Sequence, residues 1–325
     1  MASRVAIVIP TWNRAALLGQ ALENLGRQTY PIDRVIVVDN GSTDDSAAVA
    51  ARAGAQVITL ASNAGFAAAV NRGLRETDTE WIGILNNDVT PAADWLERLM
   101  AELESAGAWF ATGKLLNSRT PELIDGSFDA VCRGACALRC GHGCLDSPMW
   151  NQRRTIQLAP FTAAVFRAAL FERVGFLDER FESYLEDVDF GLRCAEAGFG
   201  GLYVPEAVAY HQGSATLGRW HPDTVRRISR NQLLLVAKHY PPNWILRYGW
   251  PVLIAQALWG FVALRHGALL SYVAGKADGL RQFREARGKH CPRFPAVVEQ
   301  SENDIREIQQ STGFDLYWRL YFALT

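Results

Sequence analysis

Glu186, Asp187 and Asp189 place three carboxylates within four residues, and aromatic side chains flank them. Crowded carboxylates in a partly apolar setting repel one another, and this repulsion can tune one of them into a general base. Glu186 and Asp187 are therefore candidate catalytic residues. The alternative is that these acids occupy the first turn of a helix, where the helix dipole favours negative charge. For Asp189 this structural interpretation is at least as well supported as a catalytic one.

Asp88 follows two asparagines at the end of a strongly apolar segment. A carboxylate at the end of a buried strand is costly unless it is paired or coordinated. One carboxylate together with diphosphate oxygens commonly holds Mg²⁺ or Mn²⁺. Alternatively, Asp88 caps a helix predicted at residues 91–104, for which Thr90 is an equally good cap. His211, after another apolar segment, is a second candidate metal ligand, although a lone His more often has a structural role.

A possible phosphate site lies at residues 62–66, Ser-Asn-Ala-Gly-Phe, between a predicted strand and a predicted helix. A glycine at a helix N-terminus lets backbone N–H groups approach an anion. Arg72, in the same predicted helix, could add a positive charge. Most helices that begin with glycine bind nothing, so this motif is weak by itself.

Alternating elements in the first hundred residues would position these groups. Predicted strands at 5–10, 34–38, 56–60 and 81–85 alternate with helical patterns at 14–28, from 44, and at 66–75. Unbroken apolar strands between helices indicate an α/β fold with a mostly parallel sheet covered on both faces. Ligands of such sheets bind beyond the carboxyl ends of the strands. Polar residues follow every predicted strand, so we expect the site there: Thr11 and Asn13, Asp39 and Asn40, Ser62 and Asn63, and Asn86 to Asp88.

Beyond residue 115 the pattern becomes less regular. Residues 115–157 are rich in Gly, Cys and Arg, which indicates a long loop or insertion. A helix is predicted at 163–174, and after residue 225 the chain is mostly helical. We therefore expect one domain at 1–220, with an irregular insertion at 115–158. A helical region for membrane association or oligomerisation is expected at 221–325.

The composition is that of a chain with a sizeable core, because 49% of the 325 residues are hydrophobic and 21% are charged. A net charge of −1 gives no reason to expect nucleic-acid binding. The charge is uneven, however. Between Thr224 and Arg293, twelve Lys and Arg residues stand against Asp278 and Glu285. This basic segment indicates an anionic surface as a partner.

Residues 250–264 are strongly apolar, but this stretch is shorter than the ~20 residues needed to span a bilayer. Trp and Tyr residues surround it, as they do at the depth of lipid headgroups. Together with the basic excess, this favours a pair of helices lying in the interface of an anionic membrane. The alternative is a buried helical hairpin in a homodimer interface, to which the aromatic residues 314–318 could add.

The first residues, MASR, lead directly into a predicted strand and do not resemble a secretory signal. We therefore expect a cytoplasmic protein, peripheral on the inner face of the cell membrane, with reduced cysteines. Cys132, Cys136, Cys140 and Cys144 recur at equal steps of four. Zinc sites usually pair two cysteines across a longer spacer, so free thiols in a loop are favoured over a zinc site.

Seven stretches, taken together and in order, resemble family 2 of the inverting GT-A glycosyltransferases, particularly its bacterial rhamnosyltransferase-like members. They are VAIVIPTWNR, VIVVDNGSTD, SNAGFAAAVNRGL, ILNNDV, VGFLDERFESYLEDVDFGLRCAEAGF, YVPEAVAYHQGS and RNQLLLVAKHYP. They cover about residues 5–241, and their combined order is far more specific than any one of them. Residues 116–159 lack such landmarks.

This resemblance implies a GT-A (Rossmann-like) catalytic domain and a role for each matching residue. The donor would be bound by Pro10, Thr11, Asn13, Asp39, Asn40, Asn63, Gly65, Arg72 and Asn87, with Thr11 and Asp39 at the base and ribose. Asp88 matches the last acid of the family's DxD motif and would bind Mg²⁺ or Mn²⁺ with the diphosphate, and His211 would complete that site. Asp187, in the pair with Glu186, would be the general base. Asn86 replaces the first acid of the motif, so fewer charges bind the metal.

The implied reaction is transfer of a sugar from a nucleotide-diphosphate donor to a hydroxyl, with inversion. By resemblance the donor is dTDP-rhamnose, with a UDP-hexose as the other possibility, and the acceptor is a lipid-linked bacterial glycan. A dehydrogenase would need a glycine-rich turn after the first strand, where Pro10, Thr11 and Asn13 stand instead. The remaining alternative is a membrane-associated sugar-nucleotide binding or scaffolding protein without turnover.

Overall fold

The computed structural model describes residues 3–213 and 220–325, and the chain divides into two compact units. Unit 1 comprises Met1–Phe128 and Gly141–Gly213, and unit 2 comprises Asp129–Cys140 and Ser214–Thr325. Ser214, the last residue of the stretch YVPEAVAYHQGS, lies outside the described residues. Residues 129–140, from the middle of the predicted insertion, belong to unit 2.

Unit 1 is built on a mixed sheet in the order β10-β12-β6-β11-β4-β1-β2-β3. Its parallel half confirms the four predicted strands: β1 (Val5–Thr11), β2 (Arg34–Asp39), β3 (Gln56–Thr59) and β4 (Trp81–Leu85). All seven residues of β1 are buried, as expected for a strand covered on both faces.

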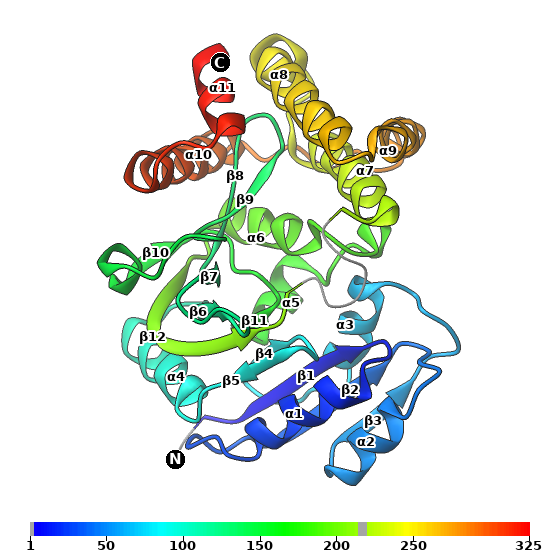
Figure 1. The fold of residues 1–325 in the computed structure, drawn as a ribbon, viewed down its shortest axis with the longest axis vertical. Helices are drawn as coiled ribbons and strands as arrows, with labels where there is room; N and C mark the ends of the chain where they lie inside the picture. Colours follow the sequence, from blue (N-terminus) through cyan, green and yellow to red (C-terminus); the bar gives the residue numbers. More distant parts are fainter. Residues whose placement is uncertain (1–2, 214–219) are drawn as a thin grey trace. The chain divides into compact units, whose positions relative to one another are not determined.

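Helices cover both faces of this half, as the alternating pattern predicts (Figure 1). They are α1 (Ala15–Leu25), α2 (Ser46–Arg52), α3 (Phe66–Leu74) and α4 (Trp95–Ala106). Leu18 of α1 and Leu99 of α4 share a core cluster with Ile7, whereas Ala69 of α3 packs with Ile36 in a separate cluster. The mostly parallel α/β architecture is therefore confirmed.

The other half of the sheet corrects two expectations. Residues 163–174 are not one helix but β11 (Ala163–Arg167) followed by α5 (Ala169–Val174). The segment 115–157 is not simply irregular, because β6 (Phe110–Asn117), β7 (Ile124–Gly126), η1 (Pro148–Asn151) and β10 (Arg154–Ile156) run through it. β11 is inserted antiparallel between β4 and β6, so it is buried on both faces and shows no alternation.

Two further strands and a helix complete unit 1. β12 (Gly201–His211) runs parallel to β6 and pairs antiparallel with the short β5 (Val89–Pro91). The 3₁₀ turn η2 (Glu179–Phe181) precedes α6 (Glu186–Ala197). Phe190 of α6 contacts the rings of Phe161, Phe166 and Phe171, with centroids 4.9–5.9 Å apart. These contacts attach α6 to the core beside β11.

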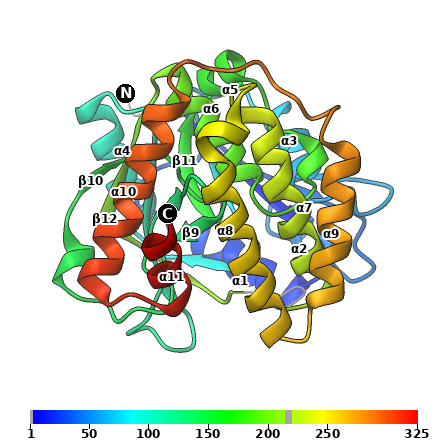
Figure 2. The same cartoon turned by 90° about the horizontal axis from the view of Figure 1, so that it is seen from above.

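The described part of unit 2 has one hairpin, of β8 (Asp129–Val131) and β9 (Ala137–Arg139), and is otherwise built from helices. Its helices are α7 (Pro222–His239), α8 (Trp244–Arg265), α9 (Leu269–Gln282), α10 (Phe294–Thr312) and α11 (Leu316–Leu324). Figure 2 shows α7, α8 and α9 side by side. Gly275 allows α9 to lie close to α7, because an added Cβ there would be 2.2 Å from the Arg226 carbonyl oxygen.

The apolar helix α8 is longer than the stretch that predicted it. It has 22 residues rather than fifteen, so by length and composition alone it could cross a membrane, and 33% of its most apolar window is buried. The argument that it is too short to span a bilayer is therefore wrong. None of the six cysteines, all of them described, forms a disulfide, and Cys132 and Cys136 are buried in the turn of the β8–β9 hairpin.

Candidate active site

Polar side chains at the ends of β1, β2 and β4 form one hydrogen-bonded network, as predicted from their positions. The Asn87 amide donates to Thr11 Oγ1 at 2.7 Å and to the Asn13 carbonyl at 3.3 Å. Asn13 in turn accepts from the Thr43 backbone N–H at 2.9 Å, and its own N–H donates to Ser42 Oγ at 2.7 Å. At the carboxyl ends of the three strands, hydrogen bonds between mostly uncharged groups therefore fix the positions of the side chains.

Asp39 and Asn40, at the end of β2, are both buried. Asp39 Oδ1 accepts from the Ser42 N–H at 3.0 Å. The Asn40 side chain accepts from the Ala64 N–H at 2.9 Å and donates to Asn63 Oδ1 at 3.0 Å. Asn40 therefore ties the end of β2 to the loop after β3.

Two of the other predicted donor-binding residues lie elsewhere on these elements. Pro10 lies within β1, opposite Val38 of β2. Arg72, on α3, forms an ion pair with Glu76 one turn later. The structure thus gives Arg72 a partner within its own helix, and its role in donor binding stays a prediction.

The structure favours the alternative for the start of α3, that it binds no phosphate, because other groups already accept the backbone N–H groups there. The Phe66 N–H donates to Ser183 Oγ at 3.2 Å and the Ala67 N–H to the Glu182 carbonyl at 2.9 Å. Gly65, at φ 91°, allows this close approach, since an added Cβ would lie 2.9 Å from the Glu182 carbonyl oxygen. The loop after β3 therefore packs against the segment that leads into α6.

That segment is strained immediately before the candidate base. Glu182, Tyr184 and Leu185 all have positive φ angles, between 58° and 72°. Such conformations cost on the order of 1–3 kcal/mol each and concentrate at functional sites. Asp187 follows in the first turn of α6, half-buried, with Oδ1 accepting from the Val188 N–H at 2.8 Å.

The two acids beside Asp187 have different surroundings. Asp189 is fully buried and paired with Arg193 at 3.1 Å. The same guanidinium donates to backbone carbonyls at residues 174–176. Asp189 therefore has the structural role that was the alternative for it. Glu186 is 6% exposed, whereas Asp187 remains partly open to solvent.

Asp88 and His211 meet at the edge where β5 pairs with β12. Their Oδ1 and Nε2 atoms are 3.2 Å apart, and each side chain is 10% exposed. The pairing places Val89 opposite His211, and the Gln212 N–H donates to the Asp88 carbonyl at 3.1 Å. The alternative of Asp88 as a helix cap is wrong, because α4 begins only at Trp95, after β5.

Asp125, on β7, is a site residue that the sequence did not indicate. Its Oδ2 lies 2.6 Å from His211 Nδ1, on the side of the ring opposite Asp88. β7 pairs with the end of β6, which neighbours the end of β12, and this brings the two residues together. The acid stands in a segment without recognisable periodicity, so no local signal pointed to it.

The two carboxylates control the charge of His211. Burial lowers the pKa of its imidazole, but the hydrogen bonds and charges of Asp125 and Asp88 raise it more, to about 9. Without a cation the imidazole is therefore protonated at neutral pH. A carboxylate on Nδ1 is also the usual partner of a metal-binding His, because it orients the ring and leaves Nε2 for the ion.

The residues at this edge fit a divalent cation. Ligands about 2.1 Å from an octahedral ion lie about 3 Å from their neighbours, close to the Asp88–His211 distance. Asn86, two residues before Asp88, has a buried Oδ1 with no hydrogen-bond partner among the described residues. Within the described ranges, no group of three His, Cys, Asp or Glu side chains is arranged so that all three could bind one metal ion. The other ligands of such an ion would therefore come from phosphate oxygens and water.

The sequence matches a known family over part of its length. Residues 6–124 match the glycosyl transferase family 2 model. The pre-mycofactocin glycosyltransferase of Mycobacterium tuberculosis is 32% identical over 221 residues, which are 66% of this chain. The chain spans only 44% of that relative's length. The N-acetylglucosaminyl-diphospho-decaprenol L-rhamnosyltransferase of M. tuberculosis is 26% identical over 89% of this chain and 100% of its own.

Solved structures share the fold at low sequence identity. A mannosyltransferase from Pyrobaculum calidifontis, in complex with GDP-Man and Mn²⁺, has a TM-score of 0.55 at 18% identity, over 99% of this chain and 87% of its own. GalNAc-T7 with UDP, GalNAc and Mn²⁺ has a TM-score of 0.65 at 14% identity, over 96% of this chain and 58% of its own. The matched segment, residues 6–124, and the glycosyltransferase relatives identify a family 2 glycosyltransferase, and the solved structures, together with the sheet described above, show that its fold is GT-A.

Proposed function

We propose that this protein transfers a sugar from a nucleotide-diphosphate donor to an acceptor hydroxyl, with inversion at the anomeric carbon. The observation that carries the proposal is the meeting of Asp88 and His211, 3.2 Å apart, at the carboxyl edge of the sheet. The uncharged network of Thr11, Asn13 and Asn87 lies at the same edge and is suited to a nucleoside.

In this proposal Asp88 and His211 bind Mg²⁺ or Mn²⁺ together with the donor diphosphate. The bound ion supplies charge neutralisation for the leaving nucleoside diphosphate. Asp125 holds the imidazole of His211 in place. The buried Asn86 oxygen would accept a hydrogen bond from a donor hydroxyl or from a metal-bound water. Mn²⁺ in the two solved structures supports this choice of ion.

Asp187 is the proposed general base. Its carboxylate takes the proton of the acceptor hydroxyl as that oxygen attacks the anomeric carbon, and the bond from this carbon to the diphosphate breaks. Among the three acids of this segment, Asp187 alone is not buried, whereas Glu186 is buried and Asp189 is buried and paired with Arg193. The strained loop before it, packed against Gly65, holds it near the donor-binding edge.

For the donor we propose dTDP-rhamnose, with a UDP-hexose as the second possibility, and for the acceptor a lipid-linked bacterial glycan. The support is the rhamnosyltransferase relative, which is aligned over its whole length. Exposed apolar residues on α8 and the basic excess of unit 2 support association of the protein with the cytoplasmic face of an anionic membrane. The identity to the pre-mycofactocin glycosyltransferase makes pre-mycofactocin the second acceptor to try.

The test is nucleoside-diphosphate release by the purified protein from a panel of dTDP- and UDP-sugars, with Mn²⁺ or with chelator. We expect chelator-sensitive release from one donor, lost in Asp88→Asn and retained in Asp94→Asn, whose acid immediately precedes α4 and pairs with Arg98. Donor binding by calorimetry without release, even with both acceptors present, would instead establish a binding protein without turnover.

A further inference from the structure

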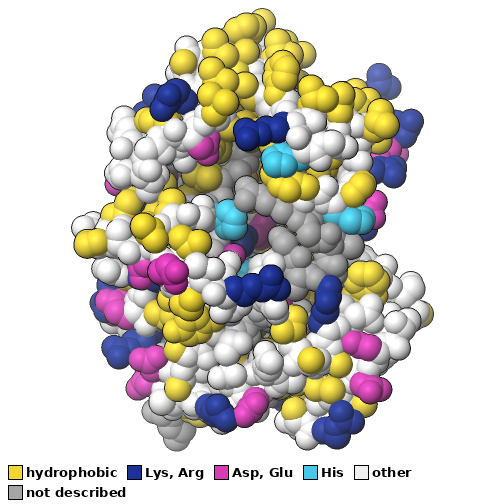
Figure 3. All heavy atoms as spheres, viewed as in Figure 1, with side chains coloured by type: hydrophobic (Ala, Val, Ile, Leu, Met, Phe, Trp, Pro, Cys, Tyr) yellow, Lys and Arg dark blue, Asp and Glu magenta, His cyan; other side chains and the backbone are white. Residues whose placement is uncertain are grey.

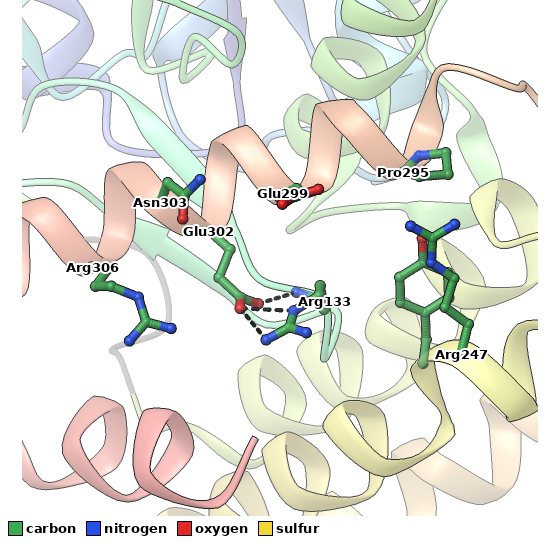
Figure 4. Close-up of a pocket in the computed structure, with 8 residues that line it drawn as sticks. Arg133, Arg247, Pro295, Glu299, Glu302, Asn303 and Arg306 are labelled. Atoms are coloured by element: carbon green, nitrogen blue, oxygen red, sulfur yellow. Dashed lines mark hydrogen bonds and ion pairs between the residues drawn. The ribbon is translucent and has the colours of Figure 1, made fainter.

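A cavity of about 350 Å³ in unit 2 is lined by three arginines. Arg133 comes from the β8–β9 hairpin, Arg247 from α8 and Arg306 from α10. Figure 4 shows Arg306 on one side and Arg247 on the other, with the pair of Arg133 and Glu302 between them. No residue of the proposed active site belongs to this cavity.

Glu302 does not neutralise the other two arginines, because its own oxygens are already engaged. Oε1 pairs with the Arg133 guanidinium at 2.7 Å, and Oε2 accepts from the Arg133 N–H at 2.7 Å and the Tyr321 hydroxyl at 2.8 Å. Arg247 and Arg306 instead lie over aromatic rings, 5.4 Å from the centroid of Tyr248 and 4.1 Å from that of Phe322. Neither forms an ion pair with a carboxylate among the described residues.

Tyr248 gives the cavity a hydrogen-bond donor without an acceptor. The residue is 2% exposed, and its buried hydroxyl has no hydrogen-bond partner within residues 3–213 and 220–325. Burial raises the pKa of this phenol, while the charges of Arg247 and Arg133 act in the opposite direction. Leaving such a group unpaired costs about 1–3 kcal/mol, so the hydroxyl favours an anionic oxygen as its partner. Glu299 is the other acid of the lining and leaves the arginines in excess.

An exposed apolar stripe runs along α8 next to this cavity. It is formed by Leu246, Trp250, Leu253, Phe261 and Leu264, which are spaced by three, four or eight residues and are 53–89% exposed. Arg247 of the cavity lies between the first two. At 1.5 Å per residue the stripe extends roughly 27 Å. Hydrophobic side chains gather over α8 in Figure 3.

The helix α11 continues the apolar surface. Leu316, Leu320 and Leu324 are exposed, and Trp250 Nε1 donates to the Leu324 carbonyl at 2.7 Å. The guanidinium of Arg306 lies over the ring of Phe322, which belongs to the same helix as these leucines. A cationic cavity therefore lies next to an apolar surface, and this combination matches a molecule with an anionic head and apolar chains.

We propose that the cavity binds the phosphate of an anionic membrane lipid, between Arg247 and Arg306, while the apolar stripe of α8 rests among the acyl chains. This assignment rests on the membrane association proposed above. It adds a site that selects phosphate, whereas a diffuse basic surface would bind any membrane of the same negative charge.

The test compares two kinds of phosphatidylcholine vesicles of equal zeta potential, one charged with phosphatidic acid and the other with oleate, a carboxylate. We expect the full-length protein to bind the phosphatidic acid vesicles about tenfold more tightly, because a phosphate monoester offers three acceptor oxygens to Arg247, Arg306 and the Tyr248 hydroxyl, whereas a carboxylate offers two. The variant Arg247→Gln/Arg306→Gln should lose this preference. The matched variant Arg265→Gln/Arg319→Gln, with arginines of α8 and α11 outside the cavity, should weaken binding to both vesicles equally and keep the preference.

Three results would overturn the proposal: equal binding of both vesicles by the wild type, an unchanged preference in Arg247→Gln/Arg306→Gln, or binding of inorganic phosphate alone as tight as that of phosphatidic acid vesicles. A stable dimer that ignores both vesicles would assign the stripe to a second copy. Melting curves would show that the variants fold. Donor cleavage without acceptor should be equal in all proteins, so its absence in the wild type would count against the proposed function and not against the cavity.

Discussion

The two halves of the sheet in unit 1 hold their polar residues by different forces. At the parallel half, Thr11, Asn13 and Asn87 form a network of neutral hydrogen bonds. At the other half, Asp88, His211 and Asp125 are held by charge. A neutral network keeps its shape at any pH, whereas the charged trio depends on whether a proton or a cation lies between the carboxylates. The proposed donor-binding edge thus keeps one arrangement, whereas the proposed metal-binding edge would change when a cation binds.

Removing the candidate base should have the largest effect, because it stops a chemical step and leaves both edges intact. We expect Asp187→Asn to lower turnover about 10²–10⁴-fold, with donor affinity nearly unchanged, as for other general bases. The measurement is product formation from donor and acceptor, with donor binding followed by calorimetry. Turnover within a factor of two of the wild type would remove Asp187 from the mechanism.

The charged edge should make stability depend on pH when metal is chelated. The folded pKa of His211 is about 9, above the ordinary value of 6.5 in the unfolded chain. Its contribution is therefore fully present below pH 6.5 and is lost as the pH rises through 9. A shift of this size corresponds to on the order of 3 kcal/mol. Urea unfolding of wild type and His211→Asn between pH 6 and 10 should show the difference shrinking with pH.

Asp125→Asn tests whether the positioning of His211 matters for the metal. Partners of a metal-binding His typically contribute 10–100-fold to metal affinity. We expect the Mn²⁺ concentration for half-maximal donor cleavage to rise by about that factor, with the rate restored at saturating Mn²⁺. Glu122→Gln, an exposed acid nearby in the chain, is the control. An unchanged Mn²⁺ requirement would make Asp125 a structural residue only.

The neutral edge should show the smallest change. Asn87→Ala removes the hydrogen bond to Thr11, which contributes about 0.5–1.5 kcal/mol to the free energy of unfolding. Combining it with Thr11→Val in a double-mutant cycle gives the coupling energy of the pair. This coupling should be the same at pH 6 and pH 9, unlike the contribution of His211. A coupling that follows pH would mean that the two edges are not independent.

Local patterns predicted the parallel half of the sheet, but not the antiparallel half. Each of β1 to β4 is next to its helix in the chain, so periodicity and polar strand ends were sufficient. β11 was predicted as a helix because an apolar strand buried on both faces has no alternation. Residues 129–140 join unit 2 through contacts such as that of Val131 N–H with Ser301 Oγ, 170 residues away.

The sequence by itself determined the parallel α/β framework and the candidates Asp88, His211 and Asp187, because these depend on residues close together in the chain. Tertiary structure alone decided that Asp125 contacts His211 across 86 residues and that Asp189 pairs with Arg193 while Asp187 stays partly open. The physical reason is that these contacts and charges are set by strand pairing and burial, which involve residues far apart in the chain. The sequence alone cannot distinguish an acidic residue in a buried ion pair from one that is open to solvent.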